Sequence, residues 1–83
     1  MDKNLILNKV TEILSKQLIV DIDTIKPDSN IASDLGADSL DVAEIAMILE
    51  EEFGHGFSDL DTSTIKTVMD IVDCVTEKVV AER

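Results

Sequence analysis

Cysteine, histidine, tryptophan and tyrosine are almost missing from this chain of 83 residues, which has one Cys, one His and neither Trp nor Tyr. Cys74 cannot form a disulfide within the chain, and His55 alone cannot make a metal site. No run of eighteen apolar residues predicts a membrane span, and residues 1–4 lack the pattern of a signal peptide. We therefore expect a soluble protein that works in the cytoplasm.

Positive charge is also scarce, since seven Lys and Arg residues stand against 18 Asp and Glu residues. Between Pro27 and Ser63 there are ten acidic residues and no Lys or Arg. Such a surface repels the phosphates of nucleic acids and of anionic lipids, and it attracts basic patches on other proteins. We expect basic protein partners and no nucleic-acid partner.

The chain is too short for two cores, so residues 1–83 are expected to form a single domain. A domain of this length buries only about 60 to 65% of its unfolded surface, which leaves little room for a deep substrate cavity. The apolar share of 45% is nevertheless high enough for an ordered core. A monomeric carrier or binding protein is favoured over an enzyme.

Apolar residues recur at helical spacing in several segments, which predicts an all-α fold. Asp38 is the expected N-cap of one helix, with Asp41 as its capping-box partner and Gly54 as its C-cap. Thr67 is expected to cap the last helix, which carries apolar residues as far as Val79. The pattern predicts a four-helix bundle with three longer helices, a short third helix and a long first loop. The first three helices are expected at residues 5–18, 39–53 and 59–65.

The long first loop, residues 19–33, contains Pro27 and several Asp and Ser residues that forbid a continued helix. Ile22, Ile25 and Ile31 are expected to be buried and to hold this loop against the core.

The segment with the clearest chemical signal is Asp34-Leu35-Gly36-Ala37-Asp38-Ser39-Leu40-Asp41. It places Ser39 in the first turn of a helix, where free backbone N–H groups and the helix dipole favour a phosphate. Taken alone, Ser39 is better interpreted as an ordinary helix-start serine. It is not expected to be a catalytic nucleophile, because no Gly-x-Ser-x-Gly turn surrounds it and His55 lies beyond the far end of the helix.

These eight residues resemble the prosthetic-group attachment motif of acyl carrier proteins. Residues 49–53 and 65–68 resemble further parts of the same family, so the resemblance covers nearly the whole chain. It implies that a phosphopantetheinyl transferase uses coenzyme A and magnesium to attach 4'-phosphopantetheine to Ser39. The thiol of that arm would then carry acyl groups as thioesters. The residues of the motif resemble most closely those of the stand-alone carriers of fatty-acid biosynthesis. Polyketide, peptidyl and D-alanyl carriers are the alternatives.

The resemblance also implies a docking surface along the second helix for the transferase and for the synthase, reductase and dehydratase enzymes. Acidic residues three apart would share one side of this helix with two apolar residues. A merely solvated face is the simpler interpretation of such a pattern. The expected docking residues are Asp38, Leu40, Asp41, Glu44, Met47 and Glu51.

Residues 54–58, Gly-His-Gly-Phe-Ser, depart from the family pattern of polar residues, an aliphatic residue and a proline. Phe57 would therefore reshape the space that an acyl chain uses. A small acidic calcium-binding protein is an alternative of another class. Neither Asp28 nor Asp34 starts a loop with the ligand spacing of an EF-hand, so the sequence does not support that alternative.

Overall fold

Three α-helices and one short 3-10 helix make up a computed structural model of the protein, which describes residues 2–54, 56–57 and 65–81. Within these ranges there is no strand, and no helix is long and apolar enough to cross a membrane. The prediction of an all-α fold is confirmed. The short helix expected over residues 59–65 lies outside the described residues except for its last position. The helices are α1 (Lys3–Leu18), η1 (Ile22–Thr24), α2 (Ser39–Phe53) and α3 (Val68–Ala81).

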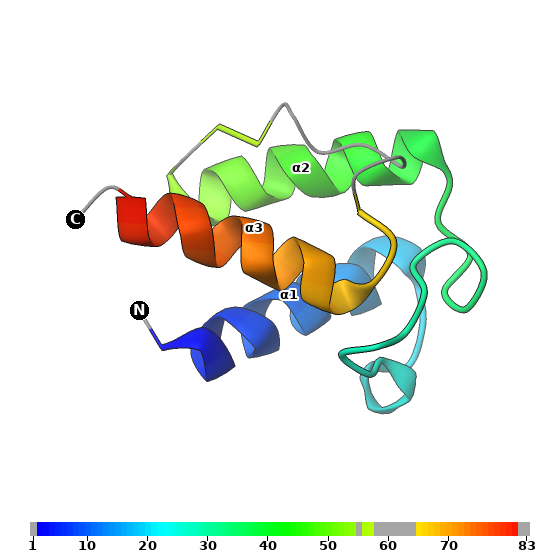
Figure 1. Ribbon diagram of the computed structural model, residues 1–83. Helices are drawn as coiled ribbons and strands as arrows, with labels where there is room; N and C mark the ends of the chain where they lie inside the picture. Colours follow the sequence, from blue (N-terminus) through cyan, green and yellow to red (C-terminus); the bar gives the residue numbers. More distant parts are fainter. Residues whose placement is uncertain (1, 55, 58–64, 82–83) are drawn as a thin grey trace.

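Helix α1 packs against both α2 and α3 (Figure 1). Lys9 forms an ion pair with Glu52 at 2.9 Å, and Gln17 lies 2.5 Å from Glu44, so α1 and α2 run antiparallel. The Glu52 carboxylate raises the pKa of the Lys9 ammonium above its usual 10.5 through their hydrogen bond. The beginning of α2 consequently lies at the same end of the molecule as the end of α1.

Both ends of α2 are as predicted. The Asp38 carboxylate accepts a hydrogen bond from the Asp41 N–H, and the Asp41 carboxylate accepts one from the Asp38 N–H. Gly54 ends the helix in the left-handed conformation with φ of 73°. Helix α1 begins two residues earlier than predicted, because Asp2 caps it by accepting from the Asn4 N–H at 3.1 Å.

The long first loop is held by the beginning of α3. The Ile31 N–H donates to the Lys66 carbonyl at 2.8 Å, and the Val68 N–H donates to the Ser29 carbonyl at 3.1 Å. Ile25 and Ile31 are buried as predicted, but the prediction for Ile22 is wrong because 44% of that residue is exposed. Ile22 begins the 3-10 turn that follows its cap, Asp21, and this turn leaves its side chain at the surface.

Ile19 ends α1 in an unusual conformation. Its φ of 55° and ψ of 53° are left-handed, and it is the one described residue other than glycine with positive φ. This conformation costs a residue with a Cβ about 1–2 kcal/mol, and it is particularly rare for a β-branched side chain. The side chain is 90% exposed, so burial does not offset this cost.

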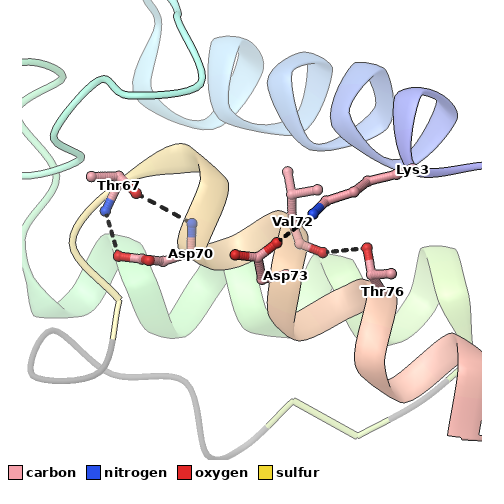
Figure 2. A network of polar contacts seen from close by, with 6 residues as sticks. All are labelled: Lys3, Thr67, Asp70, Val72, Asp73 and Thr76. Carbon is pink, nitrogen blue, oxygen red and sulfur yellow. Dashed lines mark hydrogen bonds and ion pairs between the residues drawn. The ribbon is translucent and has the colours of Figure 1, made fainter.

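Helix α3 begins with a reciprocal pair of side-chain bonds (Figure 2). The Asp70 carboxylate accepts from the N–H groups of Lys66 at 2.9 Å and Thr67 at 3.0 Å, and the Asp70 N–H donates to the Thr67 hydroxyl at 3.2 Å. The predicted cap is therefore confirmed. An ion pair between Lys3 and Asp73 at 2.8 Å joins the beginning of α1 to the same helix.

Asp70 gives the fold a specific dependence on pH. The Lys66 N–H, followed by the Thr67 N–H, lowers the pKa of the Asp70 carboxyl below its usual 3.8. A lowered pKa adds to the unfolding free energy fully above the unfolded value, and the addition is lost as pH falls through the folded value. We expect Asp70→Asn to be less stable than the wild type at neutral pH by a margin that vanishes in acid. Urea unfolding of both proteins from pH 7 to pH 2 measures this margin; a margin that is independent of pH would contradict the assignment.

Candidate functional site

The turn that leads into α2 is built on Asn30. The Asn30 side-chain oxygen accepts from the N–H groups of Ala32 at 3.0 Å and Ser33 at 2.9 Å. The Asp34 carboxylate accepts from the Asn30 N–H at 2.7 Å, and the Asp34 N–H returns a bond to the Asn30 carbonyl at 2.9 Å. Short polar side chains that bind nearby backbone in this way stabilise turns. The chain is thus fixed just before the candidate serine.

The next three residues attach this turn to the core. Leu35 and Ala37 are buried, and the Ala37 N–H donates to the Ile31 carbonyl at 3.0 Å. Gly36 lies between them with φ of 79°, a conformation that glycine adopts without steric cost. No atom lies within 4 Å of the place where a Cβ would stand on Gly36, so its role is the turn rather than a close contact.

Ser39 is the first residue of α2 and is exposed. Within the described residues, no hydrogen bond engages its hydroxyl. The Asp38–Asp41 capping box fixes the backbone on either side. The structure therefore leaves this hydroxyl exposed at the beginning of α2.

A phosphodiester on Ser39 fits the surroundings that the structure gives it. The capping box satisfies the N–H groups of Asp38 and Asp41, whereas no described residue accepts from the N–H groups of Ser39 and Leu40. Free N–H groups in the first turn of a helix and the positive end of its dipole both favour an anion. Each capping carboxylate accepts from backbone N–H, which offsets part of its repulsion toward a phosphate.

The predicted docking residues lie along α2 with unequal access to solvent. Leu40 and Met47 are 66% and 62% exposed, which is unusual for large apolar side chains. Asp38, Glu44 and Glu51 are exposed, and Asp41 is partly buried in the capping box. The structure thus presents apolar and acidic side chains together on this helix.

Gln17 is a neighbour of this surface that the sequence did not reveal. Its side-chain amide donates to the Glu44 carboxylate at 2.5 Å, across 27 positions of the chain. No spacing rule links residues on different helices, so only the packing of α1 against α2 could identify this contact.

A cavity of about 230 Å³ lies beside the beginning of α2. Its apolar lining includes Ala37 and Val42 near the serine, Ile31 from the long loop and Ile65 before α3. Phe57, which was expected to reshape the space for an acyl chain, does not line this cavity and is fully buried in the core.

The sequence model of the phosphopantetheine attachment site matches residues 8–75. An acyl carrier protein of Thermosynechococcus vestitus is 44% identical over 98% of this chain and 100% of its own length. This chain belongs to the acyl carrier protein family. Another acyl carrier protein, from Syntrophobacter fumaroxidans, is 49% identical over 78% of this chain and 80% of its own.

The fold is likewise that of acyl carrier proteins. The solution structure of the apo doublet acyl carrier protein from prodigiosin biosynthesis superposes with a TM-score of 0.76 over 89% of this chain at 24% sequence identity. The chain spans only 36% of the length of that doublet.

Membership in the acyl carrier protein family settles the class of function. The prosthetic group of the family's attachment site is 4'-phosphopantetheine, and acyl carrier proteins are carriers rather than enzymes. When bound, the group supplies a thiol for thioester chemistry, while the protein supplies position and recognition. The described residues contain no cluster of His, Cys, Asp and Glu that could hold a metal ion.

Proposed function

We propose that Ser39 is the attachment point of the 4'-phosphopantetheine and that the chain presents acyl intermediates to the enzymes of fatty-acid biosynthesis. The observation that carries this proposal is the exposed Ser39 hydroxyl at the first position of α2, between the two carboxylates of a capping box. The turn built on Asn30 and Asp34 supports it, because it holds this hydroxyl in an accessible place.

The proposal includes a docking surface formed by Asp38, Leu40, Asp41, Glu44, Met47 and Glu51. Its partners are the phosphopantetheinyl transferase and synthesis enzymes with basic patches. Acidic side chains increase the rate of encounter with a basic partner, and exposed apolar side chains add contact area once the partner has arrived. Leu40 and Met47 support this role over a merely solvated face, since their exposure has no benefit in an isolated chain.

The remaining parts of the proposal are inferred from the amino-acid sequence. Residues 1–83 form one domain and a monomer that works in the cytoplasm without nucleic acid, and residues 59–65 complete a four-helix bundle. A polyketide, peptidyl or D-alanyl pathway is the alternative use of the same carrier.

Carriage of an acyl group is tested directly with acyl-coenzyme A, magnesium and a phosphopantetheinyl transferase. Intact mass is expected to show one acyl-phosphopantetheine per chain. Neutral hydroxylamine should then remove the acyl group as its hydroxamate and leave the arm in place, because it cleaves thioesters and spares phosphodiesters. An acyl group that resists hydroxylamine would contradict thioester carriage.

Reversal of one charge tests the docking surface. We expect Glu44→Lys to raise the KM of the transferase for the apo chain roughly tenfold, equivalent to about 1.4 kcal/mol, with a smaller change in kcat. Added salt should reduce the difference because it screens exposed charges. Glu77→Lys makes the same change of net charge at an exposed position of α3 and is the matched control. Equal KM values for the two variants would show that net charge alone acts and that Glu44 has no special place.

A further inference from the structure

The end of α1 has an exposed apolar residue in a costly conformation. Ile19 is 90% exposed and left-handed, although glycine or asparagine would adopt this conformation more readily. Strained residues of this kind occur preferentially where a protein binds or reacts. The described part of the chain offers no contact that explains an isoleucine at this position.

The residues that follow Ile19 repeat the chemistry of the surface on α2. Ile22 is 44% exposed, and the flanking Asp21 and Asp23 are exposed as well. Asp21 caps η1 by accepting from the Asp23 N–H at 3.1 Å, so the turn has a defined shape. Both this turn and the docking surface therefore place exposed apolar side chains among acidic ones.

The two surfaces are also continuous. The hydrogen bond from Gln17 to Glu44 joins the last turn of α1 to α2. Ile19 lies only two residues after Gln17, so their Cα atoms are at most about 7.6 Å apart. A protein that covers Glu44 consequently reaches the end of α1 with little further extension.

We propose that the docking surface extends from α2 onto the end of α1, with Ile19 as an apolar contact and Gln17 as a positioning residue for Glu44. The partner that it fits is the transferase, a protein whose patch would combine basic residues for the acids with an apolar depression for Ile19. This inference rests on the docking role proposed for α2. The added segment comprises Gln17, Ile19, Asp21, Ile22 and Asp23.

Ile19→Gly separates this role from a structural one, because the stability of the fold should rise while the affinity of the transferase for the chain should fall. Relief of the left-handed strain should raise the melting temperature by several degrees, since about 1 kcal/mol corresponds to 4–8 °C in a domain of this size. Loss of the apolar contact should raise the KM of the transferase for the apo chain about fivefold, with kcat unchanged. Ile19→Asn, which also accepts this conformation, should raise KM likewise. Leu5→Ala removes an exposed apolar side chain from the opposite end of α1 and should leave KM unchanged.

The role of Gln17 is tested by a double-mutant cycle. Gln17→Ala should raise KM about threefold in the wild type and should have no effect in Glu44→Ala, because the carboxylate that it positions is then absent. Asn8→Ala, which removes an exposed amide elsewhere on α1, is the matched control.

The outcomes distinguish this inference from the docking role itself. If Glu44→Lys leaves KM unchanged, the docking role of α2 fails. If Glu44→Lys raises KM but neither Ile19→Gly nor Ile19→Asn does, only the extension onto α1 is overturned. If sedimentation shows that the wild type self-associates and Ile19→Gly does not, the exposed isoleucine serves a second copy of this chain, which also overturns the proposal.

Discussion

Ser39→Ala is expected to abolish incorporation of phosphopantetheine from coenzyme A while leaving the fold unchanged. The hydroxyl is exposed and, within the described residues, takes part in no hydrogen bond, so its removal breaks no contact. Alanine is also a strong helix former at this first position of α2. The variant should therefore match the wild type in circular dichroism and thermal melting. Its loss of modification would then be a loss of the attachment point alone.

Ser33→Ala is the matched control for this variant. Ser33 is another exposed serine, in the turn built on Asn30, where its backbone N–H rather than its hydroxyl makes the hydrogen bond to Asn30. It should accept phosphopantetheine at the wild-type rate. Modification of Ser39→Ala, or loss of modification in Ser33→Ala, would show that the attachment point is not at the beginning of α2.

Phe57→Ala is expected to lower the unfolding free energy by about 3–5 kcal/mol. Phe57 is the largest fully buried side chain among the described residues. Its N–H donates to the Glu50 carboxylate at 3.1 Å, and the Lys78 ammonium lies 5.6 Å from its ring centroid. Truncation would leave a cavity among described core residues whose other fully buried side chains are aliphatic. A domain of this length is stable by only roughly 4–12 kcal/mol, so this loss is a large share of its unfolding free energy.

Urea unfolding followed by circular dichroism measures this loss, which suits a chain without Trp or Tyr. Phe53→Ala removes the same ring from the last position of α2, where the side chain is only partly buried, and should cost distinctly less. Phe57→Leu keeps most of the volume and should also cost less. A loss below about 1 kcal/mol in Phe57→Ala would contradict its place in the core.

The features of this fold that could be predicted from the sequence are those set by residues close together in the chain. The capping box of Asp38 and Asp41 and the Gly54 C-cap were predictable because each involves residues within one or two turns of the chain. The exposure of Ile22 was not, because apolar character alone does not say whether a short turn will point a side chain inward. Phe57 was expected to reshape the space for an acyl chain, and its burial depends on how the segment after α2 returns to the core.

In the candidate site, too, features set within one segment were predictable and contacts between helices were not. The serine and its turn form one contiguous octet, in which Leu35 and Ala37 are buried, Gly36 turns the chain and Ser39 is exposed. These roles are local and could be anticipated from the motif. Gln17 reaches the site only because α1 packs antiparallel to α2, and the strain at Ile19 is visible only in its backbone angles. Contacts across the bundle therefore required the structure.

The most direct test of the central claim is to locate the added group in the modified wild-type protein. Tandem mass spectrometry of a protease digest, after reaction with coenzyme A, magnesium and a transferase, identifies the residue that carries the phosphopantetheine. We expect one modified residue, Ser39, and no label on Ser33 or any other hydroxyl. A group found on a different residue would contradict attachment at Ser39.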